Sequence, residues 1–194
     1  MNTTSLSLLD RLKRAKPDAA EWRRLQDIYS PLIRYWLSRL TGLHDEIEDL
    51  TQEVLVVLFR ELPGFERQRH GAFRAWLRQI AVNRMWAFCK ARRRQPVAEV
   101  GSNIEELLTQ LEDPKSELAR QWDRDHDKHV FQKLLALVQP DFAPATWQAF
   151  NRFALDGRSA ARVAKELGMS ESAVVQAKSR VLKRLREEAG DLMG

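Results

Sequence analysis

The chain has 194 residues, of which 44% are hydrophobic and 30% charged, and a formal net charge of +5. This composition supports packed cores, excludes disorder throughout the chain, and suits a polyanionic partner. A single cysteine, Cys89, excludes an internal disulfide and fits a reducing compartment. No apolar stretch approaches the roughly 18 residues of a membrane span, and the N-terminus lacks the apolar core of a signal peptide. We therefore expect a cytoplasmic protein without membrane insertion.

Helical periodicity recurs along the chain while strand-like alternation is nearly absent, so the sequence predicts an all-α fold. In the first half, proline or glycine ends most of the expected helices, and Pro31 occupies a permitted first-turn position. These helices cover residues 5–14, 18–29, 31–40, 45–62 and 71–94.

Residues 97–117 differ in character, with six acidic side chains against Lys115 alone, and with Gly101 and Pro114 interrupting any long helix. We interpret this segment as an acidic linker that holds one short helical piece at 104–111. Helices resume after it, at 117–138, at 144–155 and in a final pair. The sequence thus predicts two small helical domains, 1–96 and 118–194, joined by the linker 97–117.

The final pair, within residues 158–185, has a helix-turn-helix signature. Gly168 supplies the positive φ that ends the first helix, and Ser170 offers an oxygen that caps the second. The second helix has small polar groups near its start and cations behind them, as a DNA recognition helix does. The alternative is an ordinary helical hairpin with a solvated basic face. The apolar positions that pack the pair are Val163, Ala164, Leu167, Val174, Ala177, Val181 and Leu185.

Charge is segregated in the first half of the chain. Residues 69–94 contain eight Arg or Lys side chains and no acid. On a helical wheel, aromatic, amide and basic side chains share an arc away from the expected core, as single-stranded nucleic acid binding requires. The alternative is that both tryptophan side chains are buried in the core and that the arginines only make the protein surface more soluble. The core arc holds Phe73, Leu77, Ile80, Ala81 and Phe88, and the second arc holds Trp76, Gln79, Asn83, Trp86 and Lys90.

The preceding helix is acidic in its first half and apolar on all faces over 54–59. Acids suit a helix N-terminus, but an apolar run on every face exceeds what one buried face needs. An acidic, apolar helix beside a basic, aromatic one indicates a protein partner and a nucleic-acid partner on one small domain.

Metal and catalytic chemistry find no support in the sequence. His126 and His129 are three residues apart on an expected helix, and we interpret them as solvated because Cys89 is far away. The sequence has no catalytic constellation, and it lacks clustered carboxylates beside a phosphate-binding glycine loop. We expect a protein that is not an enzyme and that needs no metal or cofactor.

Three stretches together resemble the bacterial sigma factors of the extracytoplasmic-function class. Glu48-Asp49-Leu50-Thr51-Gln52-Glu53-Val54 resembles the E-D-x-x-Q-E-V signature of their region 2, and FRAWL at 73–77 with IAVNR at 80–84 resembles F-R-x-W-L-x-x-I-A-x-N-x. The resemblance covers about residues 20–95 for region 2 and 128–187 for region 4. TWQAF at 146–150 and AKSRVLKRLREE at 177–188 are most similar to the planctomycete type.

The resemblance implies a role for each matching position. Core RNA polymerase, through its β′ clamp helices, would bind Asp49, Gln52, Glu53, Leu50 and Val54. The minus-10 promoter element would be engaged by the loop 65–70, which takes a flipped base in the family, and by the α-helix after it: Phe65, Arg69, Trp76, Gln79, Asn83, Arg84, Trp86, Lys90, Arg92, Arg93 and Arg94. The minus-35 element would be engaged by Glu171, Ser172, Val175, Gln176, Ser179, Arg180 and Lys183.

Further partners implied by the resemblance are the polymerase β flap and an anti-sigma factor, with association to the nucleoid when bound to polymerase. Ala87, Val82 and Trp86 depart from the residue types common in the family, which leaves the base preference at the minus-10 element open. The predicted function is a sigma factor that directs promoter recognition, melting and initiation. The alternatives are a conventional helix-turn-helix regulator with an N-terminal sensing or dimerisation domain, and an RNA-processing or nucleotidyl-transfer enzyme.

Overall fold

The computed structural model describes residues 7–13, 19–41, 46–66, 71–93, 103–190 and 192. Within these ranges every regular element is a helix, as the sequence predicts. The chain divides into two compact units, Leu8–Phe131 and Gln132–Gly190, which we call the N-terminal and C-terminal units. The boundary falls inside one long helix, α6 (Glu117–Val138), and so differs from the boundaries expected around an acidic linker.

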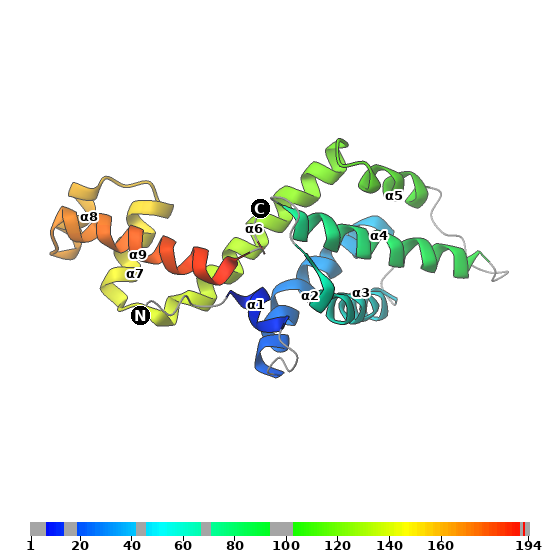
Figure 1. Ribbon diagram of the computed structural model, residues 1–194. Helices are drawn as coiled ribbons and strands as arrows, with labels where there is room; N and C mark the ends of the chain where they lie inside the picture. The colour runs from blue at the N-terminus through cyan, green and yellow to red at the C-terminus, as the bar shows by residue number, and fades with distance from the viewer. Residues whose placement is uncertain are drawn as a thin grey trace. The chain divides into compact units, whose positions relative to one another are not determined.

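Three helices form the centre of the N-terminal unit, with α3 packed against α2 and α4 packed against α3 (Figure 1). Helix α5, the short helix expected at 104–111, lies alongside α4. The elements are α1 (Leu8–Leu12), α2 (Ala19–Thr41), α3 (Ile47–Glu61), the 3-10 turn η1 (Leu62–Gly64), α4 (Ala72–Arg92), α5 (Ile104–Glu112) and the first part of α6.

Helix α2 continues through Pro31, so the predicted break between two separate helices is wrong. Proline in a helix interior removes one backbone hydrogen bond and is normally destabilising. Here Pro31 is exposed, while Tyr29 and Ile33 on either side are fully buried. Burial of one continuous apolar face holds the helix together, which a local stop signal does not reveal.

The first part of α6 belongs to the core of the N-terminal unit. Its Trp122 is 1% exposed and packs on Trp36 of α2, with ring centroids 5.1 Å apart. Its His126 is fully buried and stacks on Tyr29, which in turn contacts Phe73 of α4 at 5.5 Å. Residues 117–131 therefore pack with the helices that the sequence assigned to another domain.

The C-terminal unit is built around helices α7 (Pro144–Phe150), α8 (Ala160–Leu167) and α9 (Glu171–Ala189). Between them lie the 3-10 turn η2 (Gln139–Asp141) and the π-helix η3 (Asn151–Leu155). The apolar residues predicted to pack α8 and α9 are buried or partly buried, so that expectation is confirmed.

The turn between α8 and α9 has the predicted chemistry. Gly168 has φ 64°, a left-handed conformation that glycine adopts without strain, and it ends α8. The Ser170 hydroxyl accepts a hydrogen bond from the Ala173 N–H at 3.1 Å and begins α9. Both expectations are confirmed, and together they fix where α9 starts.

Candidate functional site

Helix α3 presents one polar stripe with an apolar end. Asp49, Gln52, Glu53 and Val56 follow the i, i+3, i+4, i+7 spacing of a single helix face, and all four are exposed. Val56 is 60% exposed, which is unusual for a valine inside an apolar run. An exposed valine flanked by acidic and amide groups can contact a partner that offers apolar and basic side chains.

Two residues that the resemblance placed at this surface lie inside the unit. Leu50 is 2% exposed and Val54 is fully buried, so both support the core and neither side chain faces a partner. Val56 was missed among the predicted residues. The available signal was its position seven residues after Asp49, which places it on the same face.

Helix α4 carries a second exposed stripe of amide and basic side chains. Gln79, Asn83 and Lys90 are exposed, and the Gln79 amide donates to the Asn83 side-chain oxygen at 2.9 Å. Trp86, on the same arc, is half-buried. The stripe therefore presents one aromatic ring, two amides and a cation, which can stack and hydrogen-bond unpaired bases.

An aromatic cluster lies at the start of α4. The rings of Phe65 and Trp76 are stacked with centroids 4.7 Å apart, and Phe73 meets Phe65 edge-on at 5.5 Å. Phe65 is 9% exposed and Trp76 is half-buried. These two predicted DNA contacts thus form a hydrophobic support at the end of the α4 stripe, where Trp76 remains partly exposed.

The remaining cations predicted for this surface differ in their surroundings. Arg92 pairs with Glu46 and Arg93 with Glu105. Arg84 is half-buried, and its Nε has no hydrogen-bond partner among the described residues. Arg69 and Arg94 lie outside the described residues, as does most of the loop 65–70 that was expected to hold a flipped base.

Two other cations of α4 are neutralised by α6, which changes the expected charge of the surface. Arg78 is 6% exposed and its Nη1 lies 2.6 Å from Asp123 Oδ1. Arg74 Nη1 lies 2.6 Å from Asp127 Oδ2. The segment 69–94 has no acid of its own, but the aspartates on α6 supply the missing negative charge from elsewhere in the sequence.

The prediction that His126 is solvated is wrong, since its side chain is fully buried in this network. Its Nδ1 lies 3.0 Å from Asp127 Oδ1, and its Nε2 lies 3.5 Å from the Tyr29 hydroxyl. A carboxylate can only accept, so Nδ1 carries the proton and Nε2 is left to accept from Tyr29. Burial lowers the pKa of His126, which keeps the imidazole neutral.

The neighbouring groups respond to the same environment. Burial and the nearby Asp127 charge raise the pKa of Tyr29 well above its usual value. Burial also acts to raise the pKa of Asp127, but the His126 hydrogen bond and the Arg74 charge outweigh it and lower that pKa. His129 is half-buried and its Nε2 lies 2.6 Å from the Ile28 carbonyl. These hydrogen bonds hold α6 against α2 and therefore have a structural role. The described residues contain no cluster suited to a metal ion.

The face of α9 opposite its buried side is open. All seven residues predicted there are exposed, and Val175 is 47% exposed. Small and polar groups come first along the helix, followed by two cations. They are Glu171, Ser172, Val175, Gln176, Ser179, Arg180 and Lys183.

Three arginines that pair with Glu166 of α8 were missed by sequence reasoning. Arg152, Arg158 and Arg162 each place a nitrogen 2.9–3.0 Å from a Glu166 oxygen. Hydrogen bonding, above all from Arg162, lowers the pKa of Glu166. Arg162 and Glu166 are four residues apart on α8, a spacing that the sequence does show, whereas Arg152 lies in η3 and joins them only through the fold.

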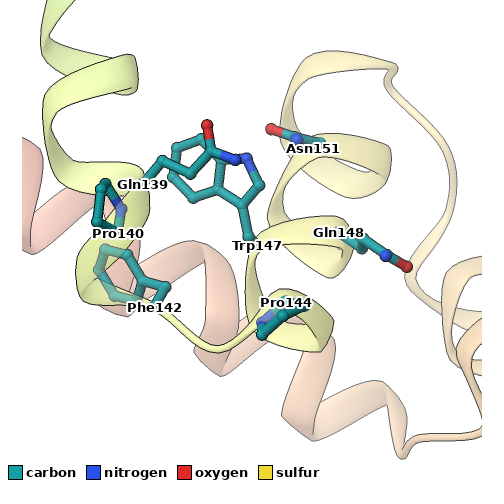
Figure 2. A pocket seen from close by; sticks show the side chains of 7 residues that line it. All are labelled: Gln139, Pro140, Phe142, Pro144, Trp147, Gln148 and Asn151. Carbon is teal, nitrogen blue, oxygen red and sulfur yellow. The ribbon is translucent and has the colours of Figure 1, made fainter.

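A groove on the C-terminal unit was also missed. It has a volume of about 550 Å³, and Figure 2 shows the Trp147 ring at its centre with Phe142, Pro140 and Pro144 nearby. The side chains of Gln139, Gln148 and Asn151 add amide groups to its lining (Figure 2). An aromatic groove with amide groups is suited to an apolar peptide segment.

The comparisons with known proteins bear on the region that holds the α3 and α4 stripes. None of the described helices has the length and apolar character needed to cross a bilayer. No curated protein matches the sequence of this chain. The family model described as Sigma-70 region 2 matches residues 25–95, which run from within α2 to beyond α4 and include both the α3 and the α4 stripes. That match supports a sigma-70 family factor, with a part in RNA polymerase binding and promoter recognition.

Proposed function

We propose that this chain is a sigma factor of the extracytoplasmic-function class, of planctomycete type, that binds core RNA polymerase and directs promoter recognition, melting and initiation. The observation that carries the proposal is the pair of exposed stripes on α3 and α4 inside the matched region. One stripe is acidic and apolar and the other is aromatic, amide-bearing and basic. The protein acts as a specificity subunit and is not itself an enzyme.

Core polymerase binds the α3 stripe, through its β′ clamp helices. Asp49, Gln52 and Glu53 offer charge and hydrogen bonding, and Val56 supplies the apolar contact at the end of the same face. Apolar side chains in the centre of an interface commonly contribute most of its binding energy, with polar residues around them. An anti-sigma factor would regulate the protein by covering this surface.

The α4 stripe engages the minus-10 element as single-stranded DNA. Trp86 and the partly exposed Trp76 stack on bases, Gln79 and Asn83 meet base edges, and Lys90 meets phosphate. Stacking tolerates any base, so the two amides carry the selectivity.

The C-terminal unit is a region 4-like domain in which α8 and α9 form a DNA-binding helix-turn-helix for the minus-35 element. Val175 suits a thymine methyl group and Gln176 suits adenine. Arg180 and Lys183 meet phosphates, which position the helix without specifying sequence. The β flap of polymerase docks on the same unit.

Run-off transcription with purified core polymerase and a promoter library tests the function directly. A sigma factor supports specific initiation when it is the only factor added to core. A conventional regulator fails this test and acts only when another sigma factor is present, so that result would select the alternative.

A pull-down on core polymerase tests the α3 stripe. Val56→Asp, and separately Asp49→Ala with Gln52→Ala, should weaken binding about tenfold or more, the effect of losing a central contact. Glu61→Ala, an exposed acid at the end of α3, is the matched control and should bind as the wild type does. Unchanged affinity in both stripe variants would refute the clamp-binding role.

A further inference from the structure

Helix α5 is anchored on the N-terminal unit by an apolar face. Ile104, Leu108 and Leu111 are at most 3% exposed, and they recur at the spacing of one helix face. Figure 1 shows α5 running along α4, and the two helices are in contact. The helix is therefore a fixed part of the unit and brings its acidic side chains to defined places.

Two of those acidic side chains meet the nucleic-acid stripe of α4. The Trp86 indole N–H donates to Glu112 Oε1 at 2.9 Å. The Arg93 guanidinium pairs with Glu105. A carboxylate and a phosphate are both anionic oxygen acceptors, and they compete for the same donors. Two residues assigned to DNA, Trp86 and Arg93, thus already have acceptors within the protein for their N–H groups.

The rest of the stripe is not covered in this way. Gln79, Asn83 and Lys90 are exposed along the same arc of α4. The contact with α5 reaches one side of the surface and leaves the other accessible. DNA can therefore approach the open side and then replace the two carboxylates.

We propose that α5 is an intramolecular competitor of DNA, in which Glu112 and Glu105 occupy Trp86 and Arg93 until single-stranded promoter DNA displaces these carboxylates. The proposal rests on the assignment of the α4 stripe to single-stranded DNA. Because α5 follows α4 in the same chain, the competition acts at a high effective concentration. Each contact is partly exposed and individually weak, so DNA held in place by polymerase can replace it while stray single strands bind less well.

Two single substitutions in the full-length protein test the competition. Glu112→Gln removes the carboxylate that meets Trp86. Glu106→Gln removes one negative charge from the same helix, at an exposed residue whose described partner is Gln110 on α5 itself. The probe is a short, fluorescently labelled single-stranded DNA of randomised sequence, with binding followed by anisotropy at fixed salt.

Both variants should bind somewhat more tightly, because each loses one negative charge. Glu112→Gln should exceed Glu106→Gln by about two- to fivefold, the range of an exposed charged contact. The excess should disappear when both substitutions are repeated in a Trp86→Phe background, which lacks the indole donor. Persistence of the excess without that donor would overturn the proposal.

Equal gains in the two variants, with binding intact, would refute the competition and leave the DNA role of α4 standing. If neither the wild type nor either variant binds the single strand, the DNA role of α4 is refuted, and the proposed competition is refuted with it. The two failures are therefore distinguishable.

Discussion

Replacing Asp123 with alanine tests how α6 is held against α4 in the N-terminal unit. Asp123 Oδ1 lies 2.6 Å from Arg78 Nη1, and Asp123 Oδ2 lies 3.5 Å from Arg74 Nε. The Arg78 side chain is 8% exposed, whereas that of Asp123 is 31% exposed. Without the carboxylate, Arg78 keeps a 3.4 Å contact with the Ala119 carbonyl as its described hydrogen bond.

The expected loss of stability follows from this geometry. Breaking a fully buried ion pair on one side costs about 3–5 kcal/mol because a charge is left uncompensated. Asp123 is partly solvated, and the Ala119 carbonyl remains, so we expect a loss of about 2 kcal/mol. The pair between Arg34 and Glu48 has side chains 50% and 56% exposed, so Glu48→Ala should cost at most about 0.5 kcal/mol.

Urea titration followed by tryptophan fluorescence measures the difference, since five of the six tryptophans lie in the N-terminal unit. With a slope of about 2 kcal/mol/M, the midpoint of Asp123→Ala should fall by about 1 M. Adding Arg78→Met should recover part of the loss, because no buried cation then remains unpaired. A midpoint for Asp123→Ala equal to that of Glu48→Ala would refute the reasoning.

Two further predictions concern base reading and pH. Gln176→Ala should change minus-35 preference by about 1–3 kcal/mol at one base in a binding-site selection, whereas a uniform loss over all sequences would mark Gln176 as a positioning residue. Burial lowers the pKa of His126 below its ordinary 6.5, so the unfolded chain binds the proton first as the pH falls below 6.5. Stability should then decrease by at most about 1.4 kcal/mol per pH unit. His126→Gln should flatten that decrease in urea titrations, and an unchanged slope would assign it to other groups.

Local chemistry made the α8–α9 turn predictable. Gly168 and Ser170 act within a few residues of their own positions, and the buried positions of α9 repeat at the helical period. The same holds for the exposed seven residues of α9, whose place follows once the buried face is known. The turn and the two faces of α9 depend on neighbours in the chain, and the sequence predicts both.

Features that depend on contacts between distant segments were harder to predict from the sequence. Pro31 looks like a helix boundary until the burial of Tyr29 and Ile33 is known. The segment around Arg74 and Arg78 looks unbalanced until α6 brings Asp123 and Asp127 against it. His126 looks solvated for the same reason. Pairings between residues more than forty positions apart leave no periodic trace in the sequence.

The Ser170 cap has a consequence for how the protein can be changed. It fixes the first residue of α9, and each following side chain is turned by about 100° around the helix axis. Val174 and Ala177 face the core and fix how α9 is rotated about its axis. The directions of the outward side chains follow from that rotation, although these side chains do not take part in the packing. The outward face can therefore be rewritten by design or by evolution at little cost in stability. A single residue inserted after the cap, within the first turn of α9, would instead rotate all the later side chains by about 100° relative to the cap.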